Sequence, residues 1–256
     1  MTTILKAEHI SKTFTLVHNR ADSLKSKVAG VFNTRYCEEI EKFHALDDIN
    51  MELRQGEAVG IIGRNGCGKS TFLKIASGIY QPTSGSITCA WDIRIGTIIE
   101  LGVGFNPELT GRENVFLSAS MHGLFDSEIE AVYDSIVEFS GLDRFMDVPM
   151  KNYSTGMQVR LGFALESTLW PQVLLVDEVL AVGDAEFQER CKVRMHQYRE
   201  KGGSIMFVSH SMASVMELCD RCYVFDAGRL IAQGTPKEAA TVYEELITGK
   251  PRAGLT

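Results

Sequence analysis

The sequence predicts an α/β fold in which the strands of a mostly parallel sheet alternate with helices. Three short runs, at residues 58–62, 173–176 and 204–208, are continuously apolar, as strands are when both faces of a parallel sheet are buried. Longer segments with helical periodicity separate these runs. A glycine-rich segment at residues 63–70 follows the first run directly. We therefore expect the three runs to form the core of a mixed sheet.

The segments nearer the N-terminus have a different pattern. Residues 4–14, 45–53 and 87–99 alternate or mix apolar and polar side chains, which is typical of edge and antiparallel strands. We expect them to form a smaller antiparallel β layer. Between the first two lies a segment of mixed charge, residues 17–43, which we interpret as a solvated insertion with some helix.

A helical insert interrupts the α/β pattern between about residues 108 and 148. It opens with a capping box at residues 110–113, and residues 127–130 form a second one. In a capping box, a side-chain oxygen and a glutamate satisfy backbone N–H groups that a helix start leaves unpaired. We therefore predict an inserted α-helical subdomain over about residues 103–168.

The C-terminal part of the chain predicts one more helix, at residues 236–247. Thr235 can cap it, Pro236 suits the first helical position, and Glu238 completes the box. Residues 248–256 are expected to form a flexible tail. We place the main domain at residues 1–247 and expect no further domain after it.

Composition and charge limit the class of protein. Of the 256 residues, 45% are hydrophobic and 23% are charged, which excludes disordered, collagenous and coiled-coil chains. Acidic residues outnumber basic ones by 33 to 26, so the formal net charge is −7. The bulk charge therefore does not favour a nucleic-acid partner, and we expect none.

Targeting segments are not expected in this chain. The N-terminus has no basic region followed by an apolar run, as a signal peptide would need. The most apolar candidate for a membrane span, residues 161–182, is broken by Glu166, Asp177 and Glu178. If the protein acts at a membrane, we expect another chain to cross it.

The six cysteines are scattered through a chain of medium length, which is typical of reduced thiols. Cys219 and Cys222 form a C-x-x-C pair, but no second pair lies at zinc spacing, so we interpret them as structural. Cys67 lies at the start of a predicted helix, where a thiol can have a lowered pKa. We hypothesise that a ligand bound there shields Cys67 from alkylation.

Residues 63–70 fit the phosphate-loop pattern G-x-x-x-x-G-K-[ST], between a strand and a helix. The glycines let backbone N–H groups point at phosphates, and the helix N-terminus adds its positive dipole end. Lys69 is expected to reach the β- and γ-phosphates of ATP, and Ser70 to place its hydroxyl on Mg²⁺. The residues expected to hold the nucleotide here are Gly63, Arg64, Asn65, Gly66, Cys67, Gly68, Lys69, Ser70 and Thr71.

An acidic pair, Asp177 and Glu178, ends the second apolar run. Carboxylates at the end of a buried strand are costly unless a metal or hydrogen bonds satisfy them. We expect Asp177 to lie on the Mg²⁺ side of the site, at the end of a strand neighbouring the phosphate loop. Glu178 is placed to polarise the attacking water as general base.

Three further segments resemble the landmarks of ABC ATPases. Residues 153–157, Tyr-Ser-Thr-Gly-Met, are similar to the signature motif, and Ser154 and Gly156 hold its two phosphate-contacting positions. Asp184 resembles the D-loop aspartate, and His210 resembles the switch histidine. The resemblance implies a P-loop NTPase of the ABC type, with His210 hydrogen-bonded to the γ-phosphate.

The resemblance also gives the second phosphate-binding helix a role. Ser154 is predicted to begin a helix, so its hydroxyl and the N–H groups around Gly156 can bind a phosphate. Each chain already has a complete phosphate loop, so the family's head-to-tail homodimer is implied, with two ATP molecules between loop and signature. The same resemblance places Phe14 where an aromatic residue stacks on adenine; packing in the core is the alternative.

Within this family, residues 100–114 and 177–184 resemble exporters of lipid-linked polysaccharides, such as O-antigen, teichoic acid and galactan transporters. Glu100 stands where the family usually has glutamine and would reach Mg²⁺ or the attacking water. That subfamily also carries a hairpin-like insertion before residue 45, but this chain leaves no room for the carbohydrate-binding domain of some members. Control of glycan length is therefore expected to lie elsewhere.

The function expected is ATP hydrolysis that drives export of a lipid-linked polysaccharide resembling O-antigen. The resemblance implies two copies of a separate polytopic permease, which contacts most of the glycan, and a peripheral location on the cytoplasmic face of the membrane. Another exported substrate, such as teichoic acid or galactan, is the main alternative. A soluble ABC ATPase acting on nucleic acid or ribosomes is a further one; such proteins usually have long coiled-coil inserts or two cassettes, and this sequence has neither.

Overall fold

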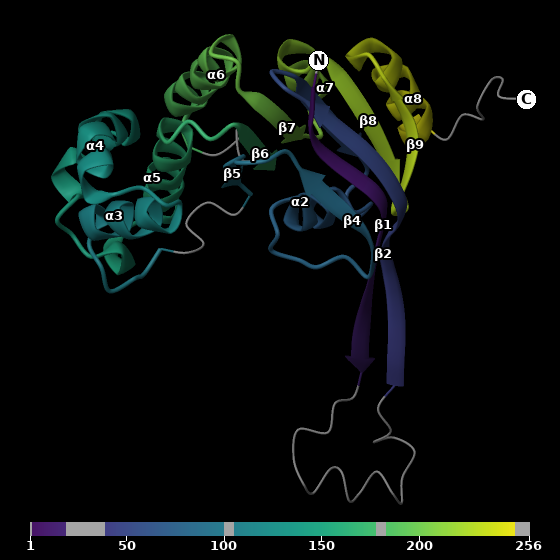
Figure 1. Cartoon of the computed structure of the whole chain (residues 1–256), viewed down its shortest axis with the longest axis horizontal. Coiled ribbons are helices and arrows are strands. Elements are labelled where there is room, and N and C mark those ends of the chain that lie inside the picture. The colour runs from purple at the N-terminus through teal and green to yellow at the C-terminus, as the bar shows by residue number, and fades with distance from the viewer. Residues whose placement is uncertain (1, 19–38, 100–104, 178–182, 249–256) are drawn as a thin grey trace, which may run out of the picture.

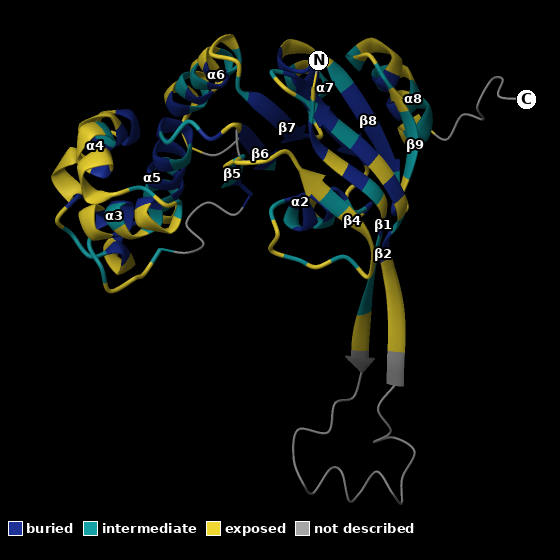
Figure 2. Cartoon of the chain, viewed as in Figure 1, coloured by how far each residue is buried: buried dark blue, intermediate teal, exposed yellow. Residues whose placement is uncertain are grey.

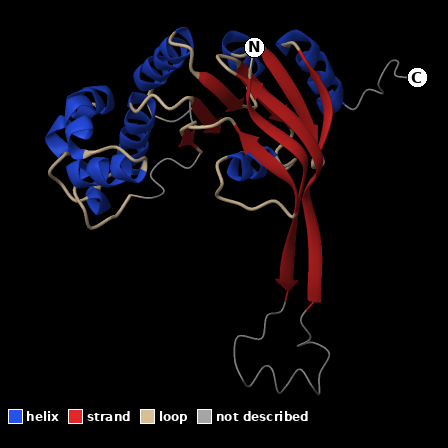
Figure 3. Cartoon of the chain, in the orientation of Figure 1, coloured by secondary structure: helices blue, strands red, loops and turns tan. Residues whose placement is uncertain are grey.

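The computed structural model describes residues 2–18, 39–99, 105–177 and 183–248. They form two sheets and a group of helices that stands to one side (Figure 1). Figure 3 shows that the helices of this group lie together, whereas strands make up the centre of the molecule. Among the described residues, no helix is long and apolar enough to cross a membrane.

A three-stranded antiparallel sheet has the order β2-β1-β4. It consists of β1 (Thr3–His18), β2 (Glu39–Arg54) and β4 (Ser84–Cys89). The predicted antiparallel layer is therefore confirmed. The distal ends of β1 and β2 extend as a hairpin away from the rest of the molecule (Figure 1).

The described ends of the insertion expected at residues 17–43 are β-strand rather than helix, because they continue the β1–β2 pairing. Leu16 and Phe43 are exposed on this hairpin. Residues 19–38 lie outside the described residues.

The second sheet has six strands in the order β5-β6-β7-β3-β8-β9. All neighbouring strands are parallel except the β8–β9 pair. The three apolar runs become its central strands, as predicted. The strands are β3 (Ala58–Gly63), β5 (Ile95–Ile98), β6 (Val173–Asp177), β7 (Ser204–Val208), β8 (Arg221–Asp226) and β9 (Arg229–Gly234).

Residues 87–99, which we expected in the antiparallel layer, contribute to that layer only in part. The segment contributes β4 to the antiparallel sheet and β5 to the six-stranded sheet. A turn separates the two strands, and Asp92 in that turn has a left-handed backbone with φ 61°. A strand cannot continue through such a conformation, so the chain changes sheets there.

Helices cover the six-stranded sheet and form the lateral group (Figure 1). Near the sheet lie α2 (Lys69–Ala76), α6 (Ala185–Glu200), α7 (Met212–Leu218) and α8 (Pro236–Thr248). The lateral group contains α3 (Gly111–Met121), α4 (Asp126–Ser140), α5 (Thr155–Thr168) and the short helices η2 (Asp143–Phe145) and η3 (Met150–Asn152).

Two of the three predicted capping boxes are present. At α3, the Glu113 N–H donates to the Thr110 hydroxyl at 3.2 Å, and the Glu113 carboxylate accepts from the Thr110 N–H at 2.8 Å. Thr235 and Glu238 repeat this exchange at α8. The box expected at residues 127–130 was wrong: α4 begins two residues earlier than a cap at Ser127 would require, with Phe125 at the N-cap position, and Glu128 accepts from the Phe125 N–H.

The core strands are continuously apolar because the sheet has a hydrophobic cluster on each face. In β3, Ala58 and Ile62 belong to the cluster that includes the lateral helices, whereas Val59 and Ile61 belong to the one beneath the antiparallel sheet. Alternate residues of a strand point to opposite faces, so both sets must be apolar. Figure 2 shows the central strands buried.

Candidate nucleotide-binding site

The phosphate loop, residues 63–70, connects buried β3 to α2 and is shaped by glycines that the surroundings require. Gly66 and Gly68 have left-handed φ angles of 77° and 106°. A Cβ on Gly68 would lie 2.6 Å from the Ala45 carbonyl oxygen, and one on Gly63 would lie 2.3 Å from that of Phe225. The loop is therefore enclosed by β2 and β8, and neither Gly63 nor Gly68 has room for a side chain.

Lys69 is the most buried charged group of this loop, with 5% of its surface exposed. Its Nζ donates to the carbonyl oxygens of Gly63 and Arg64, both at 2.9 Å. These bonds hold the ammonium group within the curl of the loop, where it faces the predicted phosphate position. Ser70 follows in the first turn of α2 and is exposed. The loop and the first turn of α2 thus supply both a cation and a hydroxyl, the groups that phosphate and metal binding require.

The expectation of an activated thiol at Cys67 was wrong. The side chain is buried, and this burial raises the pKa of the thiol despite the nearby Lys69 ammonium. A Cβ on Gly63 would lie 2.7 Å from the Cys67 Sγ, which shows how closely the thiol packs beneath the loop. The shielding of Cys67 from alkylation by bound nucleotide stays a prediction.

Asp177 ends β6 at the same edge of the sheet as the phosphate loop. The parallel register places Asp177 opposite Val208 of β7, and Val208 opposite Ile61 of β3. Strand β7 therefore lies between β3 and β6, and the expectation that Asp177 ends the strand next to the loop was wrong. Because β7 separates β6 from β3, the residues that follow β7 lie between the Asp177 carboxylate and the phosphate loop.

His210 is one of those residues and is exposed, so core packing does not explain it. It follows Ser209, a buried residue whose N–H donates to the Ile61 carbonyl at 3.3 Å. The carboxyl ends of β6, β7 and β3 thus bring Asp177, His210 and Lys69 to one edge, where α/β sheets bind ligands.

Glu178 and Glu100, the predicted general base and further metal-side residue, lie outside the described residues. The described oxygen donors, the Ser70 hydroxyl and the Asp177 carboxylate, are of the kind that Mg²⁺ prefers. This chemistry fits a magnesium ion at the predicted place.

Ser154 caps α5 as predicted, and its Oγ accepts a hydrogen bond from the Met157 N–H at 3.2 Å. Ser154 is exposed, and a Cβ on Gly156 would meet only the Ser154 Oγ, at 3.9 Å. The first turn of α5 therefore presents its N–H groups to an open space. Figure 1 shows α5 with α3 and α4, apart from α2, which carries the phosphate loop.

Asp184 caps the neighbouring helix α6 and ties it to α5. Its carboxylate accepts from the Phe187 N–H at 2.9 Å and forms an ion pair with Arg160 of α5. The Phe187 N–H and the Arg160 guanidinium hold the pKa of Asp184 below its usual range. Arg160, a residue that the sequence analysis missed, thus joins the helix capped by Ser154 to the helix capped by Asp184.

The model of the family described as ABC transporter matches residues 46–181. The chain belongs to the ABC transporter family. It is 38% identical to an O-antigen export system ATP-binding protein of Klebsiella pneumoniae over 245 residues, 96% of this chain and 99% of that one.

Other relatives and solved structures agree with this family. A teichoic acids export ATP-binding protein of Listeria monocytogenes is 38% identical over 94% of this chain and 69% of its own length. A solved ATP-binding subunit of an ABC transporter has a TM-score of 0.73 at 23% identity, over 98% of this chain and 95% of its own. A dimeric ATP-binding cassette with bound ADP and Pi has a TM-score of 0.72 at 20% identity, over 91% and 99%. As a member of this family, the chain binds and hydrolyses ATP.

Tyr153 departs from the ABC signature pattern, and its contacts give a structural reason for a tyrosine at this position. The side chain is buried and its hydroxyl donates to the Phe145 carbonyl at 2.7 Å. Burial raises its pKa to about 12. A Cβ on Gly111 would lie 2.2 Å from this hydroxyl. Tyr153 lies directly before Ser154, so its hydrogen bond anchors the start of α5 to the body of the helical subdomain.

Phe14 lies on β1, half-buried and outside both hydrophobic clusters of the described residues. Its ring packs edge-on against Tyr80, with centroids 5.7 Å apart, and the Lys12 ammonium lies 5.1 Å from its centroid. The alternative of core packing is therefore replaced by a contact with Tyr80 outside the two clusters. Stacking on the adenine of ATP remains a prediction.

Cys219 and Cys222 are free, buried thiols, as the structural interpretation predicted. Burial raises the pKa of both. A Cβ on Gly60 of β3 would lie 2.9 Å from the Cys222 Sγ and 3.3 Å from the Cys219 Sγ. The two small sulfur atoms thus let α7 approach the strand that leads into the phosphate loop of this ABC protein.

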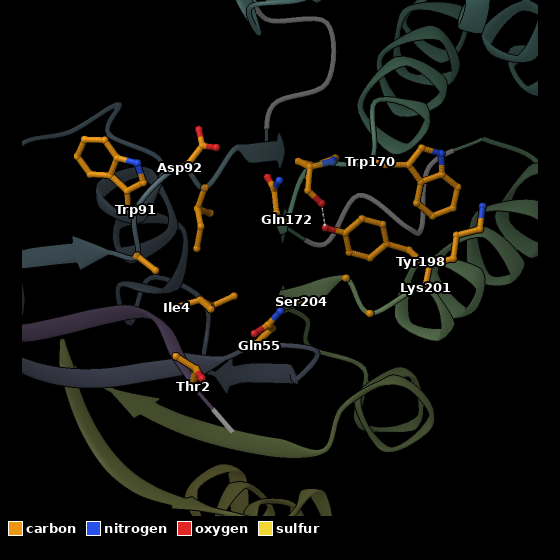
Figure 4. Close-up of a pocket in the computed structure, with 15 residues that line it drawn as sticks. Thr2, Ile4, Gln55, Trp91, Asp92, Trp170, Gln172, Tyr198, Lys201 and Ser204 are labelled. Carbon is orange, nitrogen blue, oxygen red and sulfur yellow. Dashed lines mark hydrogen bonds between the residues drawn. The ribbon is translucent and has the colours of Figure 1, made fainter.

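A cavity of about 570 Å³ lies at the amino ends of β6 and β7, the opposite edge from the ABC phosphate loop (Figure 4). Both tryptophans of the chain line it. Two of its polar groups bond within the fold: the Ser204 hydroxyl accepts from the Gly56 N–H, and the Tyr198 hydroxyl donates to the Pro171 carbonyl. Trp170 is stacked on Tyr198, with the Lys201 ammonium 3.8 Å from its centroid. These contacts stabilise the turns that precede the two strands.

Proposed function

We propose that this chain is the ATP-hydrolysing subunit of an exporter that moves a lipid-linked polysaccharide resembling O-antigen across the cytoplasmic membrane. The observation that carries this proposal is the match at 38% identity along almost the full length of an O-antigen export ATP-binding protein. Relatives named for teichoic acid export are equally similar in identity, so teichoic acid is the second candidate substrate.

The assembly proposed is a homodimer bound to two copies of a membrane permease. Each phosphate loop faces Ser154 and Gly156 of the other copy, so that each ATP lies between two positively polarised helix ends. The neighbour with bound ADP and Pi is itself dimeric, which supports this arrangement. The chain would lie on the cytoplasmic face of the membrane, and the permease would contact most of the glycan.

In each site, different residues of the chain bind the phosphates, hold the metal ion and accept the proton. Lys69 and the N–H groups of the phosphate loop bind the β- and γ-phosphates, and His210 donates to the γ-phosphate. Ser70 and Asp177 would hold Mg²⁺, with Glu100 close to it, and the ion would neutralise charge on the phosphates. Glu178 accepts the proton of the attacking water.

The conformational cycle follows from where the contacts exist. ATP favours the closed dimer only because the contacts to Ser154 and Gly156 form in that state alone. Hydrolysis removes the γ-phosphate and with it the differential affinity, so the dimer opens and the attached permease moves. Glu178→Gln is expected to bind ATP and to remain dimeric without hydrolysis.

Co-purification tests the proposed function. A tagged chain is isolated from detergent-solubilised membranes of its own host, and proteins and glycolipids are identified by mass spectrometry, with an unrelated tagged soluble ATPase as control. A polytopic permease with a lipid-linked glycan supports the proposal, and the glycan's chemistry separates O-antigen-like from teichoic acid or galactan substrates. Recovery only from the cytosol with nucleic acid or ribosomes attached would contradict it and support the soluble rival.

A further inference from the structure

The signature helix, α5, is held at its far end by a charged residue that the site described above does not use. Glu166 lies near the C-terminal end of α5, twelve residues after Ser154, and only 14% of its side chain is exposed. A buried carboxylate is retained only where it is paired and hydrogen-bonded. Its partners therefore indicate what it positions.

Glu166 joins three elements through two oxygens. Its Oε1 lies 3.0 Å from the Nε2 of His122, the residue that caps the end of α3. Its Oε2 accepts from the N–H of Thr97 in β5 at 3.3 Å. A Cβ on Gly96 would lie 3.2 Å from the same oxygen, so the carboxylate rests directly on the strand. One side chain thus contacts the signature helix, the end of α3 and the strand that leads to Glu100.

The electrostatics favour a charged pair at this junction. The Glu166 carboxylate raises the pKa of His122, while burial and the nearby Arg94 oppose that shift. The ring also lies at the C-terminus of α3, where the helix dipole favours a cation. A protonated His122 gives Glu166 a charge-assisted hydrogen bond, which is stronger than the bond to a neutral ring.

We propose that Glu166 is a positioning residue for ATP hydrolysis, and that His122 makes this positioning depend on pH. Glu166 fixes the direction of α5 relative to the six-stranded sheet, and therefore the direction in which Ser154 meets the partner's nucleotide. When His122 loses its proton, α3 is held less firmly and the signature helix is less well oriented. The proposal rests on the role of Ser154 proposed above, and on ATP hydrolysis rather than on the exported glycan.

The pH dependence has a definite sign. The pKa of His122 in the folded chain lies above its ordinary value of 6.5. The ion pair therefore stabilises the folded chain fully at pH values below 6.5. The stabilisation is lost as the pH rises through the raised pKa. Hydrolysis by the wild-type chain is therefore expected to include an alkaline decline that comes from this pair.

Variants of both partners test the proposal by steady-state ATPase assays between pH 6 and 9. Glu166→Ala should lower kcat about 10- to 100-fold, since small misplacement of a catalytic group has that effect, while KM for ATP changes little. Glu166→Gln, which keeps the shape, should recover part of kcat. His122→Gln should remove the alkaline decline, and His122→Arg, a permanent cation, should retain activity at high pH.

The matched control is His196→Gln. The Nε2 of His196, on α6, lies 3.5 Å from the Oε1 of Glu217, on α7, so this pair has the same chemistry but does not involve α5. This variant should keep the wild-type pH profile. An unchanged profile in His122→Gln, or wild-type kcat in Glu166→Gln and Glu166→Ala alike, would overturn the inference. If Glu166→Ala does not fold, the profiles of His122→Gln and Glu166→Gln decide the matter. Ser154→Ala with undiminished hydrolysis would instead show that the proposed dimer contact is wrong.

Discussion

The phosphate loop and the signature helix bind the same nucleotide in the proposed dimer, yet they are built by different means. The loop is embedded in the fold: its glycines press against backbone atoms of β2 and β8, and Lys69 is buried. The end of the signature helix at Ser154 is exposed and has open space before it. One half of the site is thus shaped by steric enclosure and the other by the placement of a helix.

This difference predicts how each half responds to change. Enclosed backbone has discrete arrangements and cannot shift gradually, so the loop keeps its shape in each chain separately. The body of the signature helix is buried in the hydrophobic core. The polar contacts of Tyr153, Arg160 and Glu166 set how its exposed start is presented, and they can be adjusted without unfolding the sheet. A site that must open and close between two chains needs one fixed half and one adjustable half. The predictions that follow test this contrast, from the largest effect to the smallest.

Gly68→Ala should have the largest effect. Its φ of 106° and the contact of 2.6 Å with the Ala45 oxygen add backbone strain to overpacking, which together cost about 3 kcal/mol or more. Thermal unfolding should show a clear loss of stability, and nucleotide binding should disappear. Gly78→Ala is the matched control, since Gly78 has φ 79° but nothing within 4 Å; it should cost only about 1–2 kcal/mol and leave binding intact. Equal effects of the two would refute steric enclosure of the loop.

Lys69→Ala should weaken ATP binding about 10- to 100-fold, the range for loss of a hydrogen bond to a charged group, and abolish hydrolysis. The fold should persist because the loop's shape depends on the glycines. Isothermal titration with ATP measures the effect. Lys74→Ala, on the same helix but against the Tyr80 ring, is the control and should bind normally. Unchanged affinity in Lys69→Ala would mean that the phosphates bind elsewhere.

Ser154→Ala should lower hydrolysis severalfold while ATP still binds the isolated chain. Loss of the cap costs about 1 kcal/mol of stability, so stability alone does not separate the two roles of Ser154. Thr110→Ala removes an equivalent cap from α3 and supplies the control. Hydrolysis should fall only in Ser154→Ala, and ATP-dependent dimerisation, followed by light scattering in the Glu178→Gln background, should weaken only there. If both variants lose hydrolysis equally, Ser154 acts through the helix alone.

Tyr153→Phe should have the smallest effect. It removes only the hydroxyl that donates to the Phe145 carbonyl, so about 1 kcal/mol of stability should be lost, measured by urea unfolding. Hydrolysis should fall less than in Ser154→Ala. Tyr133→Phe, a change of the same kind on α4, provides the comparison. A loss of hydrolysis in Tyr153→Phe as large as in Ser154→Ala would show that the helix end is less adjustable than we infer.

The sequence was sufficient for the central strands, the phosphate loop and most helix starts. These features depend on short-range physics: burial on both faces makes β3, β6 and β7 continuously apolar, and caps need specific side chains three residues apart. The family resemblance added Ser154, Asp184 and His210, which no local pattern would have singled out. Arg160 and Glu166, the two charged residues of α5, were a signal in the sequence for the contacts that were missed.

The tertiary structure decided what depends on contacts between distant segments. It placed β7 between the phosphate loop and Asp177, because strand order is set by packing across the whole sheet and leaves no local trace. It buried Cys67 and raised its pKa, which the position at a helix start could not reveal. It also joined Glu166 to His122 across 44 residues. The sequence by itself determined which chemical groups are available; only the packing of the sheet and helices determined their neighbours, and the neighbours set distance, burial and charge.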